Sequence, residues 1–432
     1  MPGTVIPRLR SASSTTPGRL TVSMVGLILL SVLTGIVGLV TIQDKANTLD
    51  DLVNHREPVN AAAQQIYRSL SDADATAASA FLAGAIEPAA DRTRYQTDIQ
   101  QAGAALAIAA TDSFGVDEAA KPLSDLAISL PVYTGLIERA SANNELGYPV
   151  GAAFLGEADN LMRTTLLPAA QQLYTIDTQR LAAEQDQATA LPWLTLILII
   201  LLAAALVLTQ RYLSRRTNRT VNLGLALASI AVIVAVVWGG VGLVLESVYV
   251  NHGQSSGSNQ VDQLSQARIA ALQARTDEVL TLVARGSVDY TKQFDTLANQ
   301  IGGKDGSGGL LGQVLANSSS SAMSSQVQSA VTAAKKWFTL HDQVDTANTG
   351  GDYQTAVNVA LGNDRTHDEA TAFDQVDTAL GNAIQAGRSD FLRQTDTAGN
   401  WLTALPIGVL VLFLVAAFGS TFGIWQRLRE YR

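Results

Sequence analysis

The stretch LTVSMVGLILLSVLTGIVGLVTI, residues 20–42, decides the fold because it contains no charged side chain over its whole length. At about 1.5 Å of rise per residue, a helix of this length crosses a hydrocarbon core of roughly 30 Å. Three further uncharged runs follow at 191–208, 221–245 and 402–425, the first of which needs its flank to Tyr212 to span comfortably. The sequence therefore predicts an all-α membrane protein that crosses the bilayer four times.

The four runs divide the chain into two copies of one layout: a membrane helix, a long polar segment and a second membrane helix. Two short matches at equivalent positions favour an internal duplication, VGLV at 37–40 and 241–244, and TALP at 189–192 and 403–406. The first run is longer than a signal-peptide core and is expected to be an uncleaved anchor. The predicted order is a tail (1–19), a membrane helix (20–42), a polar segment (43–190), a membrane helix (191–212), a loop (213–220), a membrane helix (221–247), a polar segment (248–401), a membrane helix (402–425) and a tail (426–432).

The distribution of charge sets the expected orientation, since short cytoplasmic segments retain Lys and Arg during insertion. The two tails and the 208–220 connection carry ten arginines, whereas the polar segment 43–190 has 20 acidic against 9 basic residues and 248–402 has 16 against 10. We therefore expect a multi-pass protein of a bacterial plasma membrane, with both termini in the cytoplasm and both polar segments outside.

The polar segments carry a helical pattern. Apolar residues from Val59 to Ala80 recur at alternating spacings of four and three, which is a heptad seam, and shorter seams run over 269–283 and 373–387. Three turn-rich breaks interrupt each segment, so each is expected to form an up-down-up-down four-helix bundle, with its outermost helices continuing into the membrane. The breaks lie at 87–88, 112–115 and 147–149, and at 302–309, 347–352 and 362–364.

The sequence contains no pattern that indicates catalysis. Cysteine is absent, which excludes disulfides and thiolate chemistry. The four histidines, His55, His252, His341 and His367, lack a helical partner at i+4, so we interpret them as solvated surface residues and expect no metal or other cofactor. The glycine-rich run 302–309 lacks the spacing of a phosphate-binding loop. No ionisable residue interrupts the membrane runs, which disfavours a transporter. The chain is predicted not to be an enzyme.

Arginines at the cytoplasmic ends of the membrane helices form one group of candidate residues. They either fix the topology and contact anionic lipid, or also provide a docking surface for a cytoplasmic partner. The group consists of Arg211, Arg215, Arg216, Arg219, Arg427 and Arg429.

Two further groups lie in the outer segments or at the membrane boundary. Arg68, Arg92 and Arg94 either pair with neighbouring carboxylates or contact an anionic ligand or an acidic extracytoplasmic partner. Pro192 and Pro406 fall in the first turn of a membrane helix, where proline either simply begins the helix or provides a hinge between bundle and membrane.

The layout and one stretch of sequence resemble known receptors. A helical bundle strung between two membrane helices resembles the ligand-binding module of chemoreceptors and sensor kinases, but the loop 213–220 is too short for their output domains. The doubled layout, with AQQIYRSLSDAD at 63–74 and AFLAG at 80–84, resembles the actinobacterial GlnX-type membrane receptors. That resemblance implies two partners: an extracytoplasmic solute-binding lipoprotein loaded with glutamine, glutamate or aspartate, and a cytoplasmic Ser/Thr protein kinase.

We therefore expect a non-enzymatic receptor that relays a signal from a loaded binding protein to a kinase. The alternative is a structural or accessory subunit of a cell-envelope membrane complex. Membrane lipids are expected partners and nucleic acid is not. The sequence leaves open whether two chains form a homodimer, or whether the two bundles pack together and imitate such a dimer within one chain.

Overall fold

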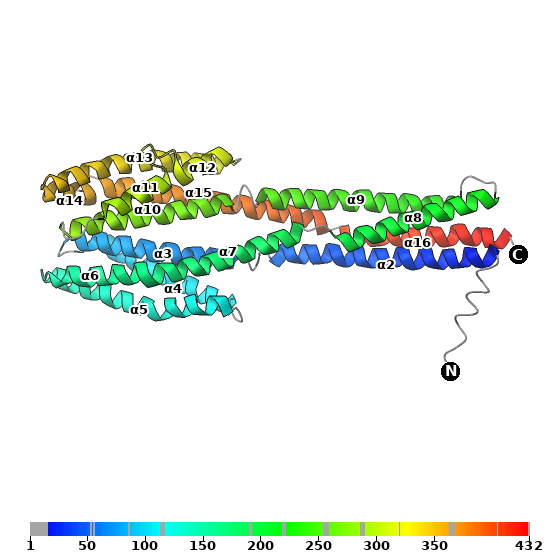
Figure 1. Ribbon diagram of the computed structural model, residues 1–432, viewed down its shortest axis with the longest axis horizontal. Coiled ribbons are helices and arrows are strands. Elements are labelled where there is room, and N and C mark those ends of the chain that lie inside the picture. The colour runs from blue at the N-terminus through cyan, green and yellow to red at the C-terminus, as the bar shows by residue number, and fades with distance from the viewer. Residues whose placement is uncertain are drawn as a thin grey trace. The chain divides into compact units, whose positions relative to one another are not determined.

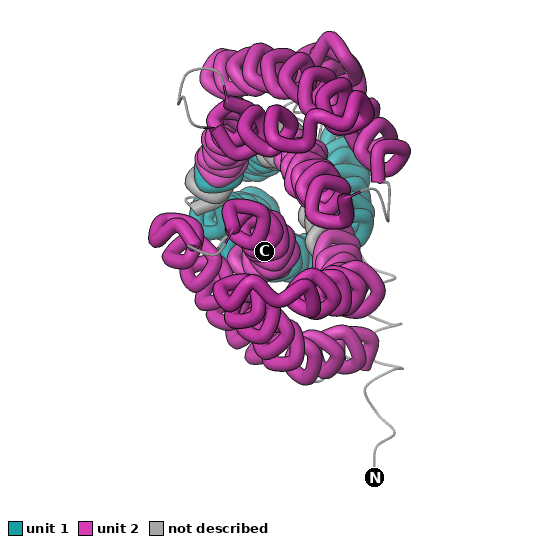
Figure 2. Tube along the Cα trace, turned by 90° about the vertical axis from the view of Figure 1, so that its left-hand side faces the viewer, with its two compact units in different colours: residues 1–51, 185–251, 394–432 teal, residues 52–184, 252–393 magenta. Residues whose placement is uncertain are grey.

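The computed structural model divides into two compact units, which we call the membrane unit (residues 1–51, 185–251 and 394–432) and the bundle unit (52–184 and 252–393) (Figure 2). Within the described residues the chain is helical and contains no strand. The structure describes residues 16–51, 54, 57–84, 87–112, 117–189, 192–217, 222–253, 259–285, 290–318, 320–362, 368–403 and 405–430.

The membrane unit is built on four long apolar helices. They contain candidate spans at Leu20–Thr48, Trp193–Ser214, Leu223–Gly242 and Leu405–Gln426, so the predicted class, an all-α membrane protein, is confirmed. Large apolar side chains on these helices are exposed, as expected for surfaces that face lipid. The helices are α2 (Thr16–Asp51), α8 (Trp193–Thr217), α9 (Leu223–Gly253) and α16 (Leu405–Glu430) (Figure 1).

Small residues let the membrane helices approach closely. A Cβ added to Gly224 at the start of α9 would lie 2.4 Å from the backbone nitrogen of Gly423 on α16. Close by, the Asn222 side chain donates a hydrogen bond of 2.8 Å to the Gly423 carbonyl. Interhelical contacts of this kind replace the hydrophobic driving force that lipid does not provide.

In the bundle unit, the first bundle comprises the helices from α3 to α7. Pro168 in α7 cannot donate a hydrogen bond to the carbonyl four residues earlier, and a single π-helical turn, η2, directly precedes this part of the helix. The helix bounds are compatible with the three predicted breaks, although 113–116 lie outside the described residues. The elements are α3 (Glu57–Leu82), α4 (Ala89–Asp112), α5 (Asp117–Glu145), α6 (Val150–Leu161), η2 (Met162–Leu166) and α7 (Leu167–Thr189).

The second bundle, from α10 to α15, has more breaks than the sequence analysis predicts. The helix expected to continue to residue 301 ends at Val283, and Arg285 adopts a left-handed backbone with φ 45°. A further break falls between Asn317 and Ser321. The prediction of only three breaks is therefore wrong for this bundle. Its helices are α10 (Asn259–Val283), α11 (Thr291–Ile301), α12 (Gly309–Asn317), α13 (Ser321–Thr349), α14 (Tyr353–Leu361) and α15 (Glu369–Thr403).

The two bundles pack together through their first helices, α3 and α10 (Figure 1). Val279 and Leu280 of α10 belong to the apolar core of the first bundle, and Ala75 of α3 belongs to that of the second. The predicted seam from Val59 to Ala80 is buried throughout. Within the bundle unit the two bundles of one chain thus lie side by side, whereas a homodimer of two chains stays a prediction.

Continuity between the bundles and the membrane helices was also predicted. The junctions fall at residues 52–53, 55–56, 190–191, 254–258 and 404, which lie outside the described residues. The predicted domain boundaries at these junctions therefore stay a prediction.

We predict that Gly224→Ala destabilises the membrane unit by about 1–3 kcal/mol, because its methyl group would overlap the α16 backbone. Gly240 lies on the same helix with nothing within 4 Å of an added Cβ, so Gly240→Ala is the matched control. Thermal unfolding of the full chain in detergent measures both. Equal losses of stability in the two variants would contradict the close α9–α16 contact.

Candidate functional site

The first helices of the two bundles are buried on nearly every side, yet both carry charges. On α3, Asp72 and Asp74 are 4% and 5% exposed, and on α10, Arg275, Asp277 and Glu278 are at most 3% exposed. A buried charge is costly unless an opposite charge and hydrogen bonds compensate it. The neighbouring helices must therefore supply partners, and these partners form three clusters.

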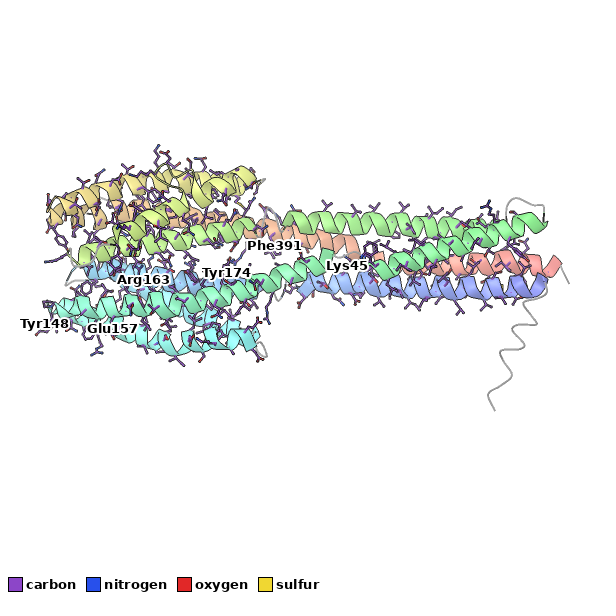
Figure 3. The ribbon with its side chains drawn as sticks, viewed as in Figure 1. Lys45, Tyr148, Glu157, Arg163, Tyr174 and Phe391 are labelled. Carbon is purple, nitrogen blue, oxygen red and sulfur yellow. The ribbon has the colours of Figure 1, made fainter. Side chains whose placement is uncertain are left out.

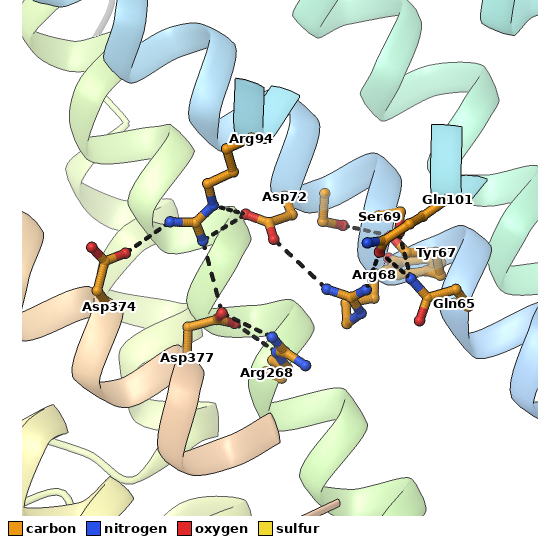
Figure 4. A network of polar contacts seen from close by, with 11 residues as sticks. Gln65, Tyr67, Arg68, Ser69, Asp72, Arg94, Gln101, Arg268, Asp374 and Asp377 are labelled. Atoms are coloured by element: carbon orange, nitrogen blue, oxygen red, sulfur yellow. Dashed lines mark hydrogen bonds and ion pairs between the residues drawn. The ribbon is translucent and has the colours of Figure 1, made fainter. Parts of the chain in front are cut away.

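The first cluster, the inter-bundle network, joins the bundles through Arg94 of α4 (Figure 4). Its guanidinium donates to Asp72 Oδ1 at 2.9 Å and, across the bundle boundary, to Asp374 Oδ1 of α15 at 2.9 Å. Arg268 of α10 holds both oxygens of Asp377 at 2.6 and 2.8 Å. Burial opposes ionisation of Asp377, but the hydrogen bonds and charge of Arg268 outweigh it and lower the pKa of this carboxyl.

Arg68 extends the network along α3. It donates to the Gln101 amide oxygen at 2.8 Å and lies 3.7 Å from Asp72 Oδ2. Burial, followed by the charge of Asp72, raises the pKa of nearby Asp98 to about 7. The negative charge around these arginines is therefore smaller than the number of carboxyl groups implies.

The second cluster, the acid cluster, centres on Arg163 in the π-helical turn (Figure 3). Arg163 bonds Asp159 one turn earlier at 2.7 Å and reaches Asp277 on α10 at 2.6 Å, which forms a second link between the bundles. The Tyr133 hydroxyl donates to Asp74 at 3.1 Å. Burial and then the charge of Asp159 raise the pKa of Asp74 to about 8, and burial raises that of Asp277 to about 6.

The third cluster lies inside the second bundle and corrects one prediction. His341 is 8% exposed, and its Nδ1 lies 2.5 Å from Glu278 Oε1, so the interpretation as a solvated surface residue is wrong for this histidine. Its partners come from other helices, which the i+4 test could not detect. His55 and His367, and the side chain of His252, lie outside the described residues.

The third cluster has enough potential ligand atoms for a cation site, but its charges do not suit one. One nitrogen and two carboxylate oxygens of Glu278, His341 and Glu369 lie within 4.8 Å of one another. However, Arg275 contacts both carboxylates, at 2.6 and 3.4 Å. Burial and the charge of Glu278 raise the pKa of Glu369 well above its usual range, which favours the neutral form of this carboxyl and makes it a poorer cation ligand. We assign the cluster to a buried ion network rather than to a metal site.

Of the outer candidates, Arg68 and Arg94 belong to the inter-bundle network, whereas Arg92 does not. Arg92 is half exposed and pairs with Glu87 at 2.7 Å and Glu145 at 3.3 Å within the first bundle. Pairing with carboxylates, one of the two predicted roles, is therefore observed for Arg92 and Arg94. The sequence analysis did not predict the burial of the acidic residues. The available indication was the position of Asp72 and Asp74 within a seam that is otherwise rich in alanine.

The cytoplasmic candidates remain predictions. Arg211 is exposed on α8, and Arg429 is exposed on α16 with its guanidinium 5.0 Å from the centre of the Trp425 ring. The residue Arg219 and the side chains of Arg215, Arg216 and Arg427 lie outside the described part of the chain.

The two candidate hinge prolines lie at the starts of membrane helices. Pro192 directly precedes α8, and Pro406 is the second residue of α16. Both positions suit a helix start. Hinge movement stays a prediction.

The fold defines a helical membrane protein whose bundles are joined by ion pairs. Residues 48–186, which include α3 to α6 and most of α7, match a family described as the actinobacterial sensor domain. This match supports an actinobacterial sensor protein with a sensing or signalling role. No curated protein and no solved structure matches the chain.

We predict that Arg163→Met destabilises the bundle unit by about 3 kcal/mol, because it leaves Asp159 and Asp277 without a counter-charge. The exposed Lys121 pairs with Asp125 only one turn away, so Lys121→Met should change the free energy of unfolding by at most about 0.5 kcal/mol. Denaturant unfolding of the full chain compares the two variants. Similar losses would show that the Arg163 link is not structural.

We predict that stability falls as pH rises from about 4 to about 8. The pKa of Asp74 is about 8 in the folded state against 3.8 as its ordinary value, so the folded state binds more protons in this interval. Asp74→Asn keeps an oxygen that accepts from Tyr133 but cannot ionise. Its melting temperature should match the wild type at pH 4 and exceed it increasingly towards pH 8. Parallel pH profiles would contradict a protonated Asp74.

Proposed function

We propose that the chain is a non-enzymatic receptor of an actinobacterial plasma membrane that relays an extracytoplasmic signal to a cytoplasmic kinase. In this proposal the bundle unit lies outside and contacts a solute-binding lipoprotein loaded with glutamine, glutamate or aspartate. The cytoplasmic partner is a soluble Ser/Thr protein kinase. The match of the first bundle to the actinobacterial sensor domain is the observation that carries the proposal.

The ion pairs between the bundles support a relay. Arg94 bonds Asp374, and Arg163 bonds Asp277, so each link joins one bundle to the other. If one bundle is displaced, the other bundle must therefore move with it, or these ion pairs must break. Packed elements with two discrete arrangements are the usual means by which such signals cross a protein.

The orientation and the partners rest on sequence. The concentration of arginines in the tails and the central loop supports cytoplasmic termini. In this proposal the same arginines form the basic surface on which the kinase docks. The two protein partners follow from the resemblance to GlnX-type receptors, and the membrane-spanning layout is compatible with them.

An accessory subunit in which the bundles serve as spacers is the competing function. Apolar packing would be sufficient to stabilise a spacer, since replacing a buried ion pair by apolar residues is often neutral or stabilising. The bundle unit instead buries Arg275, Glu278 and Glu369 in one cluster and Asp277 in another. The burial of such groups favours a role in which the relative register of the helices matters.

We predict that deleting the gene abolishes the change in phosphorylation of the kinase's substrates that follows addition of glutamate or aspartate to the cells. Re-expression of the wild-type chain should restore the change. Asp374→Asn should restore it only in part, because this half-exposed residue receives the Arg94 hydrogen bond between the bundles. Quantitative phosphoproteomics in the three strains measures the response.

Asp305→Asn is the matched control for this experiment. It makes the same change of charge at an exposed residue between α11 and α12 of the second bundle. It should restore the full response. An unchanged response in the deletion strain would refute the relay, and stable co-purification with a large envelope complex, independent of nutrients, would favour the accessory role.

A further inference from the structure

A cleft of about 380 Å³ lies where α3 of the first bundle meets α10 and α15 of the second. It is partly open to solvent. This volume falls at the lower end of the roughly 300–1,000 Å³ that small-molecule sites occupy. The cleft is therefore large enough for a small metabolite, and both bundles contribute to its walls.

Guanidinium groups dominate the charge of the lining. Arg68, Arg268 and Arg388 line the cleft, and Asp377 is the only carboxylate among the described lining residues. Arg268 is fixed by its two hydrogen bonds to Asp377. It also lies over Gly381, where an added Cβ would come within 3.2 Å of Arg268 Nη1. The pairing with Asp377 fixes the orientation of the Arg268 guanidinium. The lining contains three guanidiniums and one carboxylate among the described residues.

Two of the guanidiniums contact neutral oxygens at the cleft. Arg68 donates to the Gln101 amide oxygen at 2.8 Å and also lies 3.7 Å from Asp72 Oδ2. Arg388 donates, among its contacts, to the Gln64 amide oxygen at 3.3 Å. Burial and then the charge of Arg268 lower the pKa of Arg68, although Asp72 and Asp377 act in the opposite direction. An added anion would relieve this repulsion between the guanidiniums.

Most of the remaining lining side chains are polar. They are the amides of Gln64, Gln65, Asn382 and Gln385 and the hydroxyls of Ser265 and Thr378, with Ala61, Ile269 and Ile384 as the apolar part of the walls. Amides both donate and accept hydrogen bonds, so they can bind neutral polar groups of a ligand. A planar guanidinium fork matches a carboxylate.

We propose that the cleft binds a small organic carboxylate, with its carboxylate held by Arg68 and Arg388 and its other polar groups bound by the surrounding amides. The bound molecule would contact α3 and α15 together and so bridge the two bundles. This inference goes beyond the proposed function, in which the stimulus arrives on a partner protein. It can be tested on the purified chain without any partner.

The test uses the full chain in neutral detergent. Succinate and inorganic phosphate are titrated at pH 7, each against NaCl of equal ionic strength, with melting temperature and calorimetry as the measurements. Succinate should raise the melting temperature saturably, and phosphate should raise it less. Arg68→Gln and Arg388→Gln should each weaken succinate binding about tenfold or more, the loss expected for a charge-assisted hydrogen bond.

Arg92→Gln is the matched control, because Arg92 lies on α4 outside the cleft and pairs with Glu87 and Glu145. It should leave succinate binding unchanged. Should the arginine variants unfold, Gln385→Trp offers a second test: this exposed residue of the wall should tolerate the change, and the indole should block binding. The proposal is overturned if succinate has no effect beyond NaCl, if phosphate binds as well as succinate, or if Arg92→Gln loses as much affinity as the cleft variants.

Discussion

The arrangement of the bundle unit depends on one constraint: α3 and α10 are buried on nearly all sides while they carry charged side chains. Asp277 is fully buried, and Arg275 is 3% exposed. Each charge needs a partner at one particular height along the bundle, since an uncompensated buried charge costs several kcal/mol. Arg163 and Arg94 provide such partners from the first bundle. Apolar seams rich in alanine would tolerate a sliding movement, so it is the ion pairs that fix the register.

Much of the fold could be predicted because it is encoded locally. Uncharged runs of sufficient length define the membrane helices, and the alternation of spacings between Val59 and Ala80 identifies a helix face that is indeed buried. The break after Val283 differs from the prediction, because the helix was expected to continue past the end of its seam to the glycine-rich run 302–309. The pair Gly286-Ser287 was the available turn signal there. Arg285 itself takes a left-handed backbone that non-glycine residues rarely adopt.

The candidate site was less predictable, because its partners are distant in sequence. Pairing with a neighbouring carboxylate is one of the two roles predicted for Arg94, but nothing in the spacing indicates Asp374, which lies 280 residues away. His341 shows the same limit, since its partner Glu278 belongs to another helix. A local test such as i+4 spacing detects sites built on one helix. This protein builds its polar clusters between helices, where only the packed structure brings the groups together.

The ion network and the cleft share residues, and this sharing couples them. Asp377 holds Arg268 at the cleft wall and also lies 3.8 Å from Arg94, which bonds Asp374 and Asp72. An anion held by Arg68 and Arg388 would add a negative charge near Asp377 and so change the attraction of Asp377 to Arg268 and Arg94. By linkage, if binding of the anion changes the free energy of a displacement of α15 relative to α4, that displacement changes the binding free energy of the anion by the same amount. A sensor built this way needs no separate transmission element, because Asp377 both lines the cleft and lies 3.8 Å from Arg94 of the other bundle.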